Sequence, residues 1–205
     1  MTTTDLNGTG VNPTDVNDVT ATDLHDTDLH DTAVLLAAVV RTPAGPLAVV
    51  TTTDGVVRAA GYADLDAMIR RLATAGRRAP DVAAVRPGDL PGALVDALGR
   101  YADGDPAALD AVPVDQPGGP FSQAAWAAMR RVPPGSTVTY TELAGFAGRP
   151  TAVRAAGTAC ARNLVAPFVP CHRVVRSDGT LGGYAYGLDV KRALLAHERT
   201  AAGSD

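Results

Sequence analysis

The sequence predicts an α/β (α+β) fold made of a small antiparallel sheet with helices, followed by a mostly helical domain. Two observations predict this order. Short β-prone runs separated by turn residues occupy the first half, and apolar residues at helical spacing occupy the second. Residues 113–119, rich in Pro and Gly, separate the two parts and indicate a linker. The chain has 205 residues, of which 46% are hydrophobic, which is enough to supply a core.

Residues 1–32 are predicted to be a disordered acidic tail. They contain seven Asp and no Lys or Arg, and they are rich in Thr and Asn. Such a segment cannot bury enough apolar area to offset the entropy lost on ordering. Residues 120–205, in contrast, contain ten basic and five acidic residues, although the whole chain has a net charge of −4. This basic region is compatible with a polyanionic partner such as nucleic acid, but a charge imbalance taken alone is more common on an ordinary solvated face.

Residues 33–112 are predicted to form an N-terminal α/β domain. Three β-prone runs begin near residues 33, 47 and 56, and Asp54-Gly55 between the last two is a hairpin signature. Helices are expected over 64–78 and 90–103, where apolar residues recur at helical spacing. No cluster of titratable residues stands out here, so this part is interpreted as scaffold.

The second part begins with an amphipathic helix expected over 121–132, which Pro133-Pro134-Gly135 ends. Thr139 and Glu142 have the spacing of a capping box and predict a short helix that ends before Gly148. Pro150 suits the first turn of a further helix, which we expect to run to about residue 161. Two short helices joined by a tight turn indicate a helix-turn-helix, with a plain packed helix pair as the alternative.

The second of these helices has two distinct faces. Val153, Ala156, Gly157 and Cys160 fall at positions i, i+3, i+4 and i+7, which predicts a stripe facing the core with Cys160 as a buried packing residue. The opposite face carries Thr151, Arg154 and Thr158. Small residues along the helix would let its backbone approach a groove closely.

Pro170-Cys-His-Arg-Val-Val175 is the segment most suggestive of chemistry. Its apolar flanks predict burial, yet His172 and Arg173 cannot be buried without hydrogen-bond partners. A polar network around a thiol is how a weak nucleophile becomes a thiolate. The only two cysteines, Cys160 and Cys171, resemble neither a disulfide framework nor a zinc site. With no membrane-spanning run and no secretory signal, a cytoplasmic protein without a membrane partner is expected.

Residues 120–199 resemble the catalytic, DNA-binding domain of the O6-alkylguanine-DNA alkyltransferases, also called methylated-DNA–protein-cysteine methyltransferases. The stretches that carry the resemblance occur in the family's order: Phe121-Ser-Gln-Ala-Ala-Trp126, Tyr140-Thr-Glu-Leu-Ala144, Arg154-Ala-Ala-Gly157, Asn163, Pro170-Cys-His-Arg-Val174, Gly182-Gly-Tyr184 and Lys191-Arg-Ala-Leu-Leu-Ala-His-Glu198. Residues 33–112 are similar only in general shape to the family's variable N-terminal domain, and 200–205 form a short tail. Leu164 departs from the family, in which Pro often follows the asparagine.

The resemblance implies a DNA repair protein that moves an alkyl group from guanine O6 irreversibly to its own cysteine, once per molecule. Cys171, on the active-site Cys loop, would be the nucleophile and methyl acceptor. His172 would take the thiol proton through a water, and Glu198 would orient His172. Tyr140 would donate a hydrogen bond or proton to the departing base, and Asn163 would hydrogen-bond near the thiol.

The resemblance also implies that the damaged nucleotide is flipped out of double-stranded DNA containing O6-alkylguanine. Arg154 would fill the vacated stack while its helix enters the minor groove. The expected DNA-binding residues are Arg154, Tyr140, Thr151, Ala155, Gly157 and Thr158. In the base pocket, backbone groups of Val174 and Ala185 would read the base edge, Tyr184 would form a wall, and Tyr186 would narrow the pocket against O6-benzylguanine. A monomer without metal or cofactor is expected.

Three other functions share some of these features. Alkyltransferase-like proteins bind the same lesions without catalysis, but they usually have Trp where this chain has Cys171. Methylation-sensing transcriptional regulators carry an additional zinc domain with four cysteines, for which this chain has no spare Cys. A thiol hydrolase using Cys171, His172 and Glu198 would turn over repeatedly, and adjacent Cys and His are unusual for that class.

Overall fold

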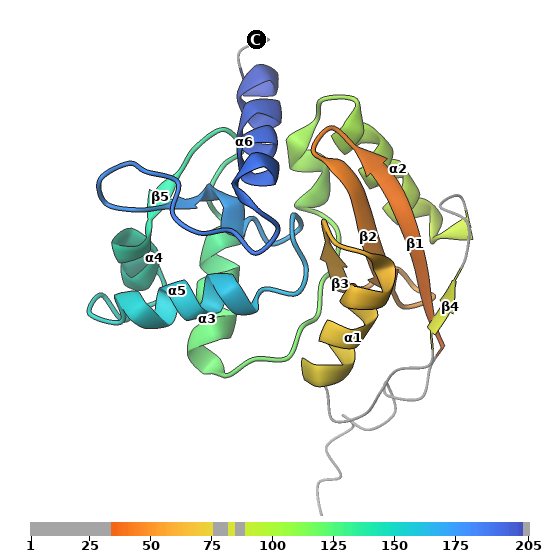
Figure 1. Cartoon of the computed structure of the whole chain (residues 1–205), viewed down its shortest axis with the longest axis horizontal. Coiled ribbons are helices and arrows are strands. Elements are labelled where there is room, and N and C mark those ends of the chain that lie inside the picture. Colours follow the sequence, from red (N-terminus) through yellow and green to blue (C-terminus); the bar gives the residue numbers. More distant parts are fainter. Residues whose placement is uncertain (1–33, 76–81, 85–88, 203–205) are drawn as a thin grey trace, which may run out of the picture. The chain divides into compact units, whose positions relative to one another are not determined.

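The computed structural model describes residues 34–75, 82–84 and 89–202 (Figure 1), and for 82–84 and 201–202 it describes the backbone alone. The tail predicted at residues 1–32 lies outside the described residues, as do positions 76–78 of the helix predicted over 64–78. None of the helices in the described ranges combines the length and apolar character needed to cross a membrane.

The predicted antiparallel sheet is confirmed. It is built from β1 (Leu35–Thr42), β2 (Gly45–Thr51) and β3 (Val57–Gly61), in the order β3-β2-β1. The Asp54-Gly55 turn lies between β2 and β3, and Gly55 has a φ of +94°, a left-handed conformation that glycine adopts at little cost. A strand that was not predicted, β4 (Val82–Ala84), pairs in parallel with the start of β1.

One helix covers each face of this sheet (Figure 1). The helices are α1 (Leu65–Ala75) and α2 (Gly92–Ala102). Successive residues of β2 point to opposite faces, so Val50 clusters with Met68 of α1 while Val49 clusters with Leu94 of α2. Because β2 is covered on both faces, it reads as a continuous apolar run rather than an alternating one.

The second part is mostly helical, as predicted, and its elements in chain order after η2 (Pro106–Leu109) are α3 (Pro120–Arg130), β5 (Val138–Thr139), α4 (Tyr140–Phe146), α5 (Val153–Arg162), η3 (Cys171–Arg173), β6 (Val174–Val175) and α6 (Leu188–Ala202). The capping box that opens α4 is present: the Glu142 backbone N–H donates to Thr139 Oγ1 at 3.1 Å, and the Thr139 N–H donates to Glu142 Oε2 at 2.7 Å. Gly148, with a φ of +78°, follows the end of α4.

The start of α5 differs from the prediction. The Ala152 N–H donates to the Arg149 carbonyl at 2.9 Å, which closes a separate turn around Pro150, and the helix begins only at Val153. Thr151 therefore precedes the helix and is exposed. The positions of α5 that are fully buried are Ala156 and Ala159. The Trp126 indole N–H donates to the Ala159 carbonyl at 2.9 Å, which anchors α5 to α3.

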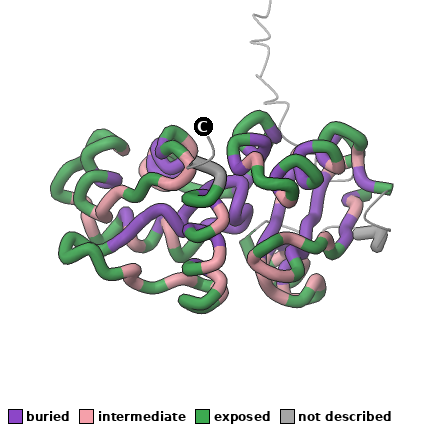
Figure 2. Tube along the Cα trace, turned by 90° about the horizontal axis from the view of Figure 1, so that it is seen from above, coloured by how far each residue is buried: buried purple, intermediate pink, exposed green. Residues whose placement is uncertain are grey.

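The free edge of β3 joins the sheet to the helical part. Val57 exchanges backbone hydrogen bonds with residues 113 and 115 of the predicted linker. Further along the same strand, the Ala60 N–H donates to the Leu164 carbonyl at 2.7 Å. Both parts contribute to one core cluster, and Figure 2 shows buried positions, in purple, running through the strands and through interior segments of the helical part. The sheet therefore borders the segment that follows α5.

Candidate active site

The Cys loop is buried throughout. Every residue from Asn163 to Val175 is buried, as the apolar flanks of the Cys-His-Arg segment predicted. Its last strand, β6, pairs in parallel with β5, so Val174 lies beside Val138 and Val175 beside Thr139. Because α4 starts directly after β5, this pairing brings the first residue of α4, Tyr140, to the Cys loop.

Cys171 is only 7% exposed, and its sulfur has one side-chain hydrogen-bond donor. The Asn163 amide donates from Nδ2 to Cys171 Sγ at 3.2 Å and to the Val169 carbonyl at 2.7 Å. Burial raises the pKa of the Cys171 thiol, while the Asn163 hydrogen bond and the positive charge of Lys191 act in the opposite direction. The thiol is therefore protonated at neutral pH and needs a proton acceptor before it can attack.

The residue next to the thiol belongs to a buried ionic network. His172 Nε2 lies 2.7 Å from Glu198 Oε1, and both side chains are about 1% exposed. Arg173 donates to the same carboxylate from Nε at 3.1 Å and from a terminal nitrogen at 2.9 Å, and the Gly135 N–H donates to Glu198 Oε2 at 3.1 Å. Burial alone would raise the pKa of Glu198, but the hydrogen bonds from His172 and Arg173 outweigh it and hold that pKa at about 2. The carboxylate of Glu198 is thus a hydrogen-bond partner for both His172 and Arg173, as the sequence predicted that they need.

This network also fixes the protonation of His172. Burial lowers the pKa of the imidazole, and the hydrogen bond with Glu198 opposes that shift only in part. An ionised Glu198 accepts the proton on Nε2, so the neutral ring carries its lone pair on Nδ1. Among the described residues, Nδ1 is buried and has no hydrogen-bond partner. His172 therefore offers a basic nitrogen in the loop that carries the thiol.

A cavity of about 260 Å³ opens onto the sulfur. Its lining residues come from α4, α5, the Cys loop and the loop before α6: Tyr140, Gly157, Cys160, Ala161, Cys171, Gly183, Tyr184 and Ala185. Four of the predicted site residues besides Cys171 are thus brought together here, namely Tyr140, Gly157, Tyr184 and Ala185. Burial raises the pKa of Tyr140, and proximity to Cys160 and Cys171 raises it further, so its hydroxyl remains a proton donor at neutral pH.

Cys160 has a different position from the one predicted. It is half-buried and lines the cavity, whereas we predicted a buried packing residue. The reason is the orientation of α5, which directs Ala156 and Ala159 into the core and leaves Gly157 and Cys160 at the edge of the stripe. Burial raises the pKa of the Cys160 thiol, and the nearby Cys171 raises it further.

The outer face of the helix-turn-helix carries the predicted DNA-binding side chains. Thr151, Arg154, Ala155 and Thr158 are all exposed. Thr158 Oγ1 donates to the Arg154 carbonyl at 3.1 Å, an interaction within α5 that leaves the Arg154 side chain at the surface. Gly157 alone among the predicted DNA-binding residues of α5 faces the cavity.

Two predicted pocket residues do not line this cavity. Val174 lies in β6, fully buried, and its carbonyl accepts a hydrogen bond from Lys191 Nζ at 2.6 Å. Tyr186 points away from the cavity, toward β3 and α1, where Gly61 leaves room for its hydroxyl. Tyr186 is therefore not part of the cavity lining, because its ring packs on the sheet side, and its effect on O6-benzylguanine stays a prediction.

Gln116 lies in the predicted linker and was assigned no role in the site from the sequence. It is buried, and its Nε2 donates to Asn163 Oδ1 at 3.1 Å while its Oε1 accepts from the Leu164 N–H at 2.7 Å. The Gln116 carbonyl in turn accepts from Gln123 Nε2 at 2.8 Å. A polar side chain within a Pro- and Gly-rich stretch looks solvated, so nothing in the local sequence marks Gln116.

Lys191 was missed as well, although the sequence contained a signal for it. Lys191, Leu194, Leu195 and Glu198 fall at i, i+3, i+4 and i+7, and these four are the buried row of α6. Lys191 Nζ donates to the carbonyls of Val174 and Leu181, which joins α6 to β6 and to the loop before α6. Lys191 is the only lysine of the chain, and it lies on the apolar face of a helix. This position predicts a buried side chain with hydrogen-bond partners.

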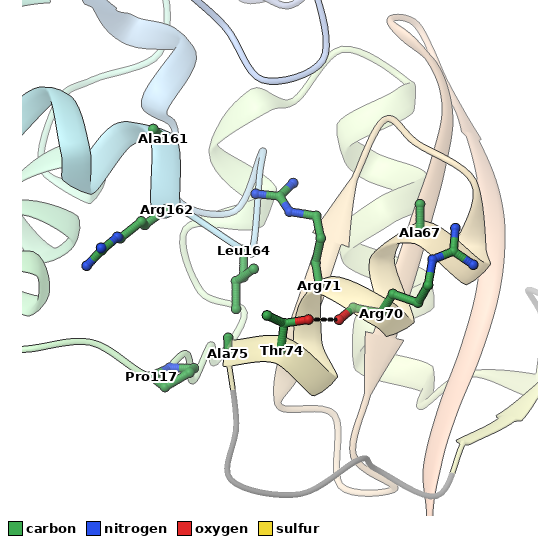
Figure 3. A pocket seen from close by; sticks show the side chains of 9 residues that line it. All are labelled: Ala67, Arg70, Arg71, Thr74, Ala75, Pro117, Ala161, Arg162 and Leu164. Carbon is green, nitrogen blue, oxygen red and sulfur yellow. Dashed lines mark hydrogen bonds between the residues drawn. The ribbon is translucent and has the colours of Figure 1, made fainter.

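A second cavity of about 760 Å³ is larger but lies elsewhere (Figure 3). Its lining residues come from α1, the end of α5 and the neighbouring segments: Ala67, Arg70, Arg71, Thr74, Ala75, Pro117, Ala161, Arg162 and Leu164. The three arginine side chains point in different directions rather than at a common centre (Figure 3). Neither Cys171 nor His172 lines it, so the smaller cavity is the reactive one.

Comparisons with known proteins identify the family to which this chain is similar. Residues 120–200 match the family model described as 6-O-methylguanine DNA methyltransferase, DNA binding domain. The methylated-DNA–protein-cysteine methyltransferase of Salmonella typhimurium is 37% identical over 164 residues, which are 80% of this chain and 95% of that protein. The bifunctional transcriptional activator/DNA repair enzyme Ada of Escherichia coli is 51% identical over 87 residues, 42% of this chain, and the match spans only 25% of Ada.

Solved structures extend the similarity to the fold. The crystal structure of Mycobacterium tuberculosis OGT in complex with DNA superposes with a TM-score of 0.62 and 31% identity, covering 82% of this chain and 96% of that chain. Both the sheet and the helical part are thus included in the likeness. Because the identity to the Salmonella protein extends over nearly its whole length, the chain belongs to the methylated-DNA–protein-cysteine methyltransferase family.

Proposed function

We propose that this protein repairs O6-methylguanine in double-stranded DNA by transferring the methyl group irreversibly to Cys171, once per molecule. The observation that carries the proposal is the position of Cys171 Sγ, which lies at the cavity with the Asn163 amide 3.2 Å away. The neighbouring His172 is oriented by Glu198 at 2.7 Å. A nucleophile, a base and a carboxylate that orients the base are the three parts that thiol activation requires.

The transfer begins with removal of the thiol proton. The proton passes from Cys171 Sγ through one bridging water to His172 Nδ1, the ring atom left free by the Glu198 hydrogen bond. The imidazolium that forms is stabilised by the ionised Glu198, whose pKa of about 2 keeps it charged. The Asn163 amide N–H stabilises the negative sulfur directly.

The thiolate then displaces guanine from the methyl carbon. The sulfur–carbon bond forms as the bond between carbon and O6 breaks, and the electron pair of that bond remains on the guanine. Tyr140, which lines the cavity, donates its hydroxyl proton or a hydrogen bond to the base as this charge develops. The product is S-methylcysteine, a thioether that no group in the site can return to a thiol, so each molecule reacts once.

The target carbon is inaccessible inside a duplex, so the nucleotide must be flipped out, at a cost of a few kcal/mol. Arg154, exposed on α5, is suited to fill the vacated position, and the neighbouring Ala155 and Thr158 allow α5 to approach the minor groove. The ten basic residues of region 120–205 favour the phosphate backbone. Since all proposed catalytic residues come from one chain, we propose a monomer, and its two free cysteines suit the reducing cytoplasm.

Incubation with a duplex oligonucleotide containing one O6-methylguanine tests this proposal. Intact-protein mass spectrometry should show the addition of one CH2 unit per molecule, located at Cys171 by peptide mapping. Cys171→Ala should gain no mass yet still bind the damaged duplex. Repeated turnover by a substoichiometric amount of protein would indicate a hydrolase instead. Lesion binding by the wild type without any mass increase would indicate a non-catalytic binding module.

A further inference from the structure

The loop between β6 and α6 forms one wall of the active-site cavity. Gly183, Tyr184 and Ala185 line that cavity, and the loop is bordered by Gly182 and Gly187, with φ values of +67° and +91°. Glycine adopts these left-handed conformations at little cost, which lets the chain turn at both ends of the loop. Lys191 holds the start of the loop from the α6 side through the Leu181 carbonyl, and a second contact on the sheet side would hold its cavity-lining residues from the other side.

Tyr186 provides an anchor for this loop on the sheet side. Its hydroxyl accepts a hydrogen bond from an Arg71 guanidinium nitrogen at 2.7 Å and lies 3.4 Å from the Ala60 carbonyl. Its ring packs edge-on against Tyr62 and Tyr184, with centroids 6.1 and 5.6 Å away. A Cβ atom at position 61 would lie 2.1 Å from the Tyr186 hydroxyl, so glycine is required there for the anchor to fit.

Arg71 connects the anchor to the residue that contacts the sulfur. It leaves α1 toward the segment after α5, while Arg70 points away (Figure 3). One terminal nitrogen donates to Tyr186, and the other lies 3.4 Å from the Asn163 carbonyl. The guanidinium carbon also lies 5.6 Å from the centre of the Tyr186 ring. A single half-buried cation thus bridges the cavity-lining loop and the Asn163 backbone.

We infer that Arg71 and Tyr186 are positioning residues for methyl transfer, which together hold the loop 182–187 against the cavity at the width of a methylated base. This inference rests on the proposed function. The part of the chain interpreted from its sequence as scaffold then controls the shape of the reactive cavity, because Arg71 lies in α1. Tyr186 limits large alkyl groups by tying down the cavity wall rather than by occupying the cavity.

Single-turnover kinetics of Tyr186→Phe, Arg71→Ala and the double variant test the inference. Tyr186→Phe keeps the ring and removes only the hydroxyl that accepts from Arg71. With the methylated duplex at saturating concentration, each single variant should react about tenfold more slowly, the lower end of the effect expected for losing one hydrogen bond to a charged group. The concentration of DNA giving half-maximal rate should stay unchanged, since neither residue lies on the outer face of α5. The double variant should be no slower than the slower single variant.

The reaction with free O6-benzylguanine distinguishes a positioning role from a general structural role. A general loss of stability would not change the ratio of the benzyl to the methyl transfer rate. A loosened wall should raise the ratio of the benzyl to the methyl transfer rate in all three variants. Arg70→Ala, which removes the neighbouring exposed arginine of α1, should match the wild type in both rates. Unchanged ratios, or losses that multiply in the double variant, would overturn the inference. Failure of the wild type itself to accept a methyl group would overturn the proposed function instead.

Discussion

The reactivity of Cys171 depends on which end of the Asn163 amide faces the sulfur. The amide oxygen accepts from Gln116 Nε2 and from the Val165 N–H, so the amide nitrogen must face Cys171. Gln116 cannot reverse this order, because its own oxygen is bonded to the Leu164 N–H. At the scale of single residues, Gln116 therefore determines that a hydrogen-bond donor, and not an acceptor, faces the sulfur.

Gln116→Leu should slow methyl transfer about tenfold, because the Asn163 amide is no longer held in one orientation and its donation to the thiolate weakens. Loss of the partner of the Leu164 N–H should also lower the free energy of unfolding by about 1–3 kcal/mol. The pH profile of Cys171 alkylation by iodoacetamide should shift to higher pH, measured in a Cys160→Ala background. An unshifted profile in a folded variant would show that Gln116 has only a structural role.

The pH dependence of transfer should follow His172. Its folded-state pKa lies below the usual 6.5, so the neutral base persists at pH 6.5 and is lost only as the pH falls further. The single-turnover rate should therefore keep more than half of its plateau value at pH 6.5 and decline as the pH falls further. Glu198→Gln, which removes the carboxylate that orients His172, should lower the rate across the whole range. A decline that begins above pH 7 in the wild type would contradict this assignment.

At the scale of elements, α5 has two functions on different sides. Gly157 and Cys160 form part of the cavity, while Arg154, Ala155 and Thr158 face outward from the same ten residues. The Trp126 hydrogen bond to Ala159 fixes the helix between these two surfaces. One rigid helix thus connects the surface proposed to bind DNA with the cavity proposed to receive the base.

Arg154→Ala should therefore reduce repair of duplex DNA much more than reaction with free O6-methylguanine. The variant loses the side chain proposed to replace the flipped nucleotide, whereas the cavity is unchanged. We expect a loss of about tenfold or more with the duplex and less than twofold with the free base, both from single-turnover rates. Arg192→Ala, an exposed arginine on α6, is the matched control and should resemble the wild type. Equal losses with both substrates would exclude a flipping role for Arg154.

At the scale of the whole molecule, the ion pair between Arg173 and Glu198 links the Cys loop, α6 and the turn after α3. The pKa of Glu198 is lowered to about 2 in the folded protein from its ordinary value of 4.5. A depressed carboxylate pKa stabilises the fold fully above pH 4.5, and this contribution disappears as the pH falls toward 2. The contribution is about 3 kcal/mol, given about 1.4 kcal/mol per pH unit.

Thermal unfolding between pH 7 and 2 should show this contribution. The wild type should lose stability steeply below pH 4.5, and Glu198→Gln should show a shallower loss over the same range. At pH 7 the variant should be less stable by about 3–5 kcal/mol, because Arg173 keeps its charge without a partner. Asp189→Asn, an exposed carboxylate near the start of the same helix, should leave the acid transition unchanged. Parallel acid profiles for Glu198→Gln and the wild type would contradict the assignment.

The methylated product should be less stable than the reactive protein. The added methyl group must fit on the side chain of Cys171, a residue that is 7% exposed, and overpacking at buried sites commonly costs about 1–3 kcal/mol. Differential scanning calorimetry before and after stoichiometric reaction should therefore show a lower unfolding temperature. An equal or higher temperature would mean that the cavity accommodates the methyl group without strain.

The sequence by itself determined the elements whose signals are local. The Asp54-Gly55 turn, the Thr139–Glu142 capping box and the apolar rows of the helices each depend on residues within a few positions of one another. The family motif around Cys171 likewise identified the chemistry. The expected burial of His172 and Arg173 also predicted that both side chains have hydrogen-bond partners. Only the tertiary structure placed Gln116 on Asn163, Lys191 on Val174 and Tyr186 on Arg71. These contacts join residues 17 to 115 positions apart, so no local pattern encodes them, and the packing of α1, the linker and α6 around the Cys loop and the loop before α6 decides them.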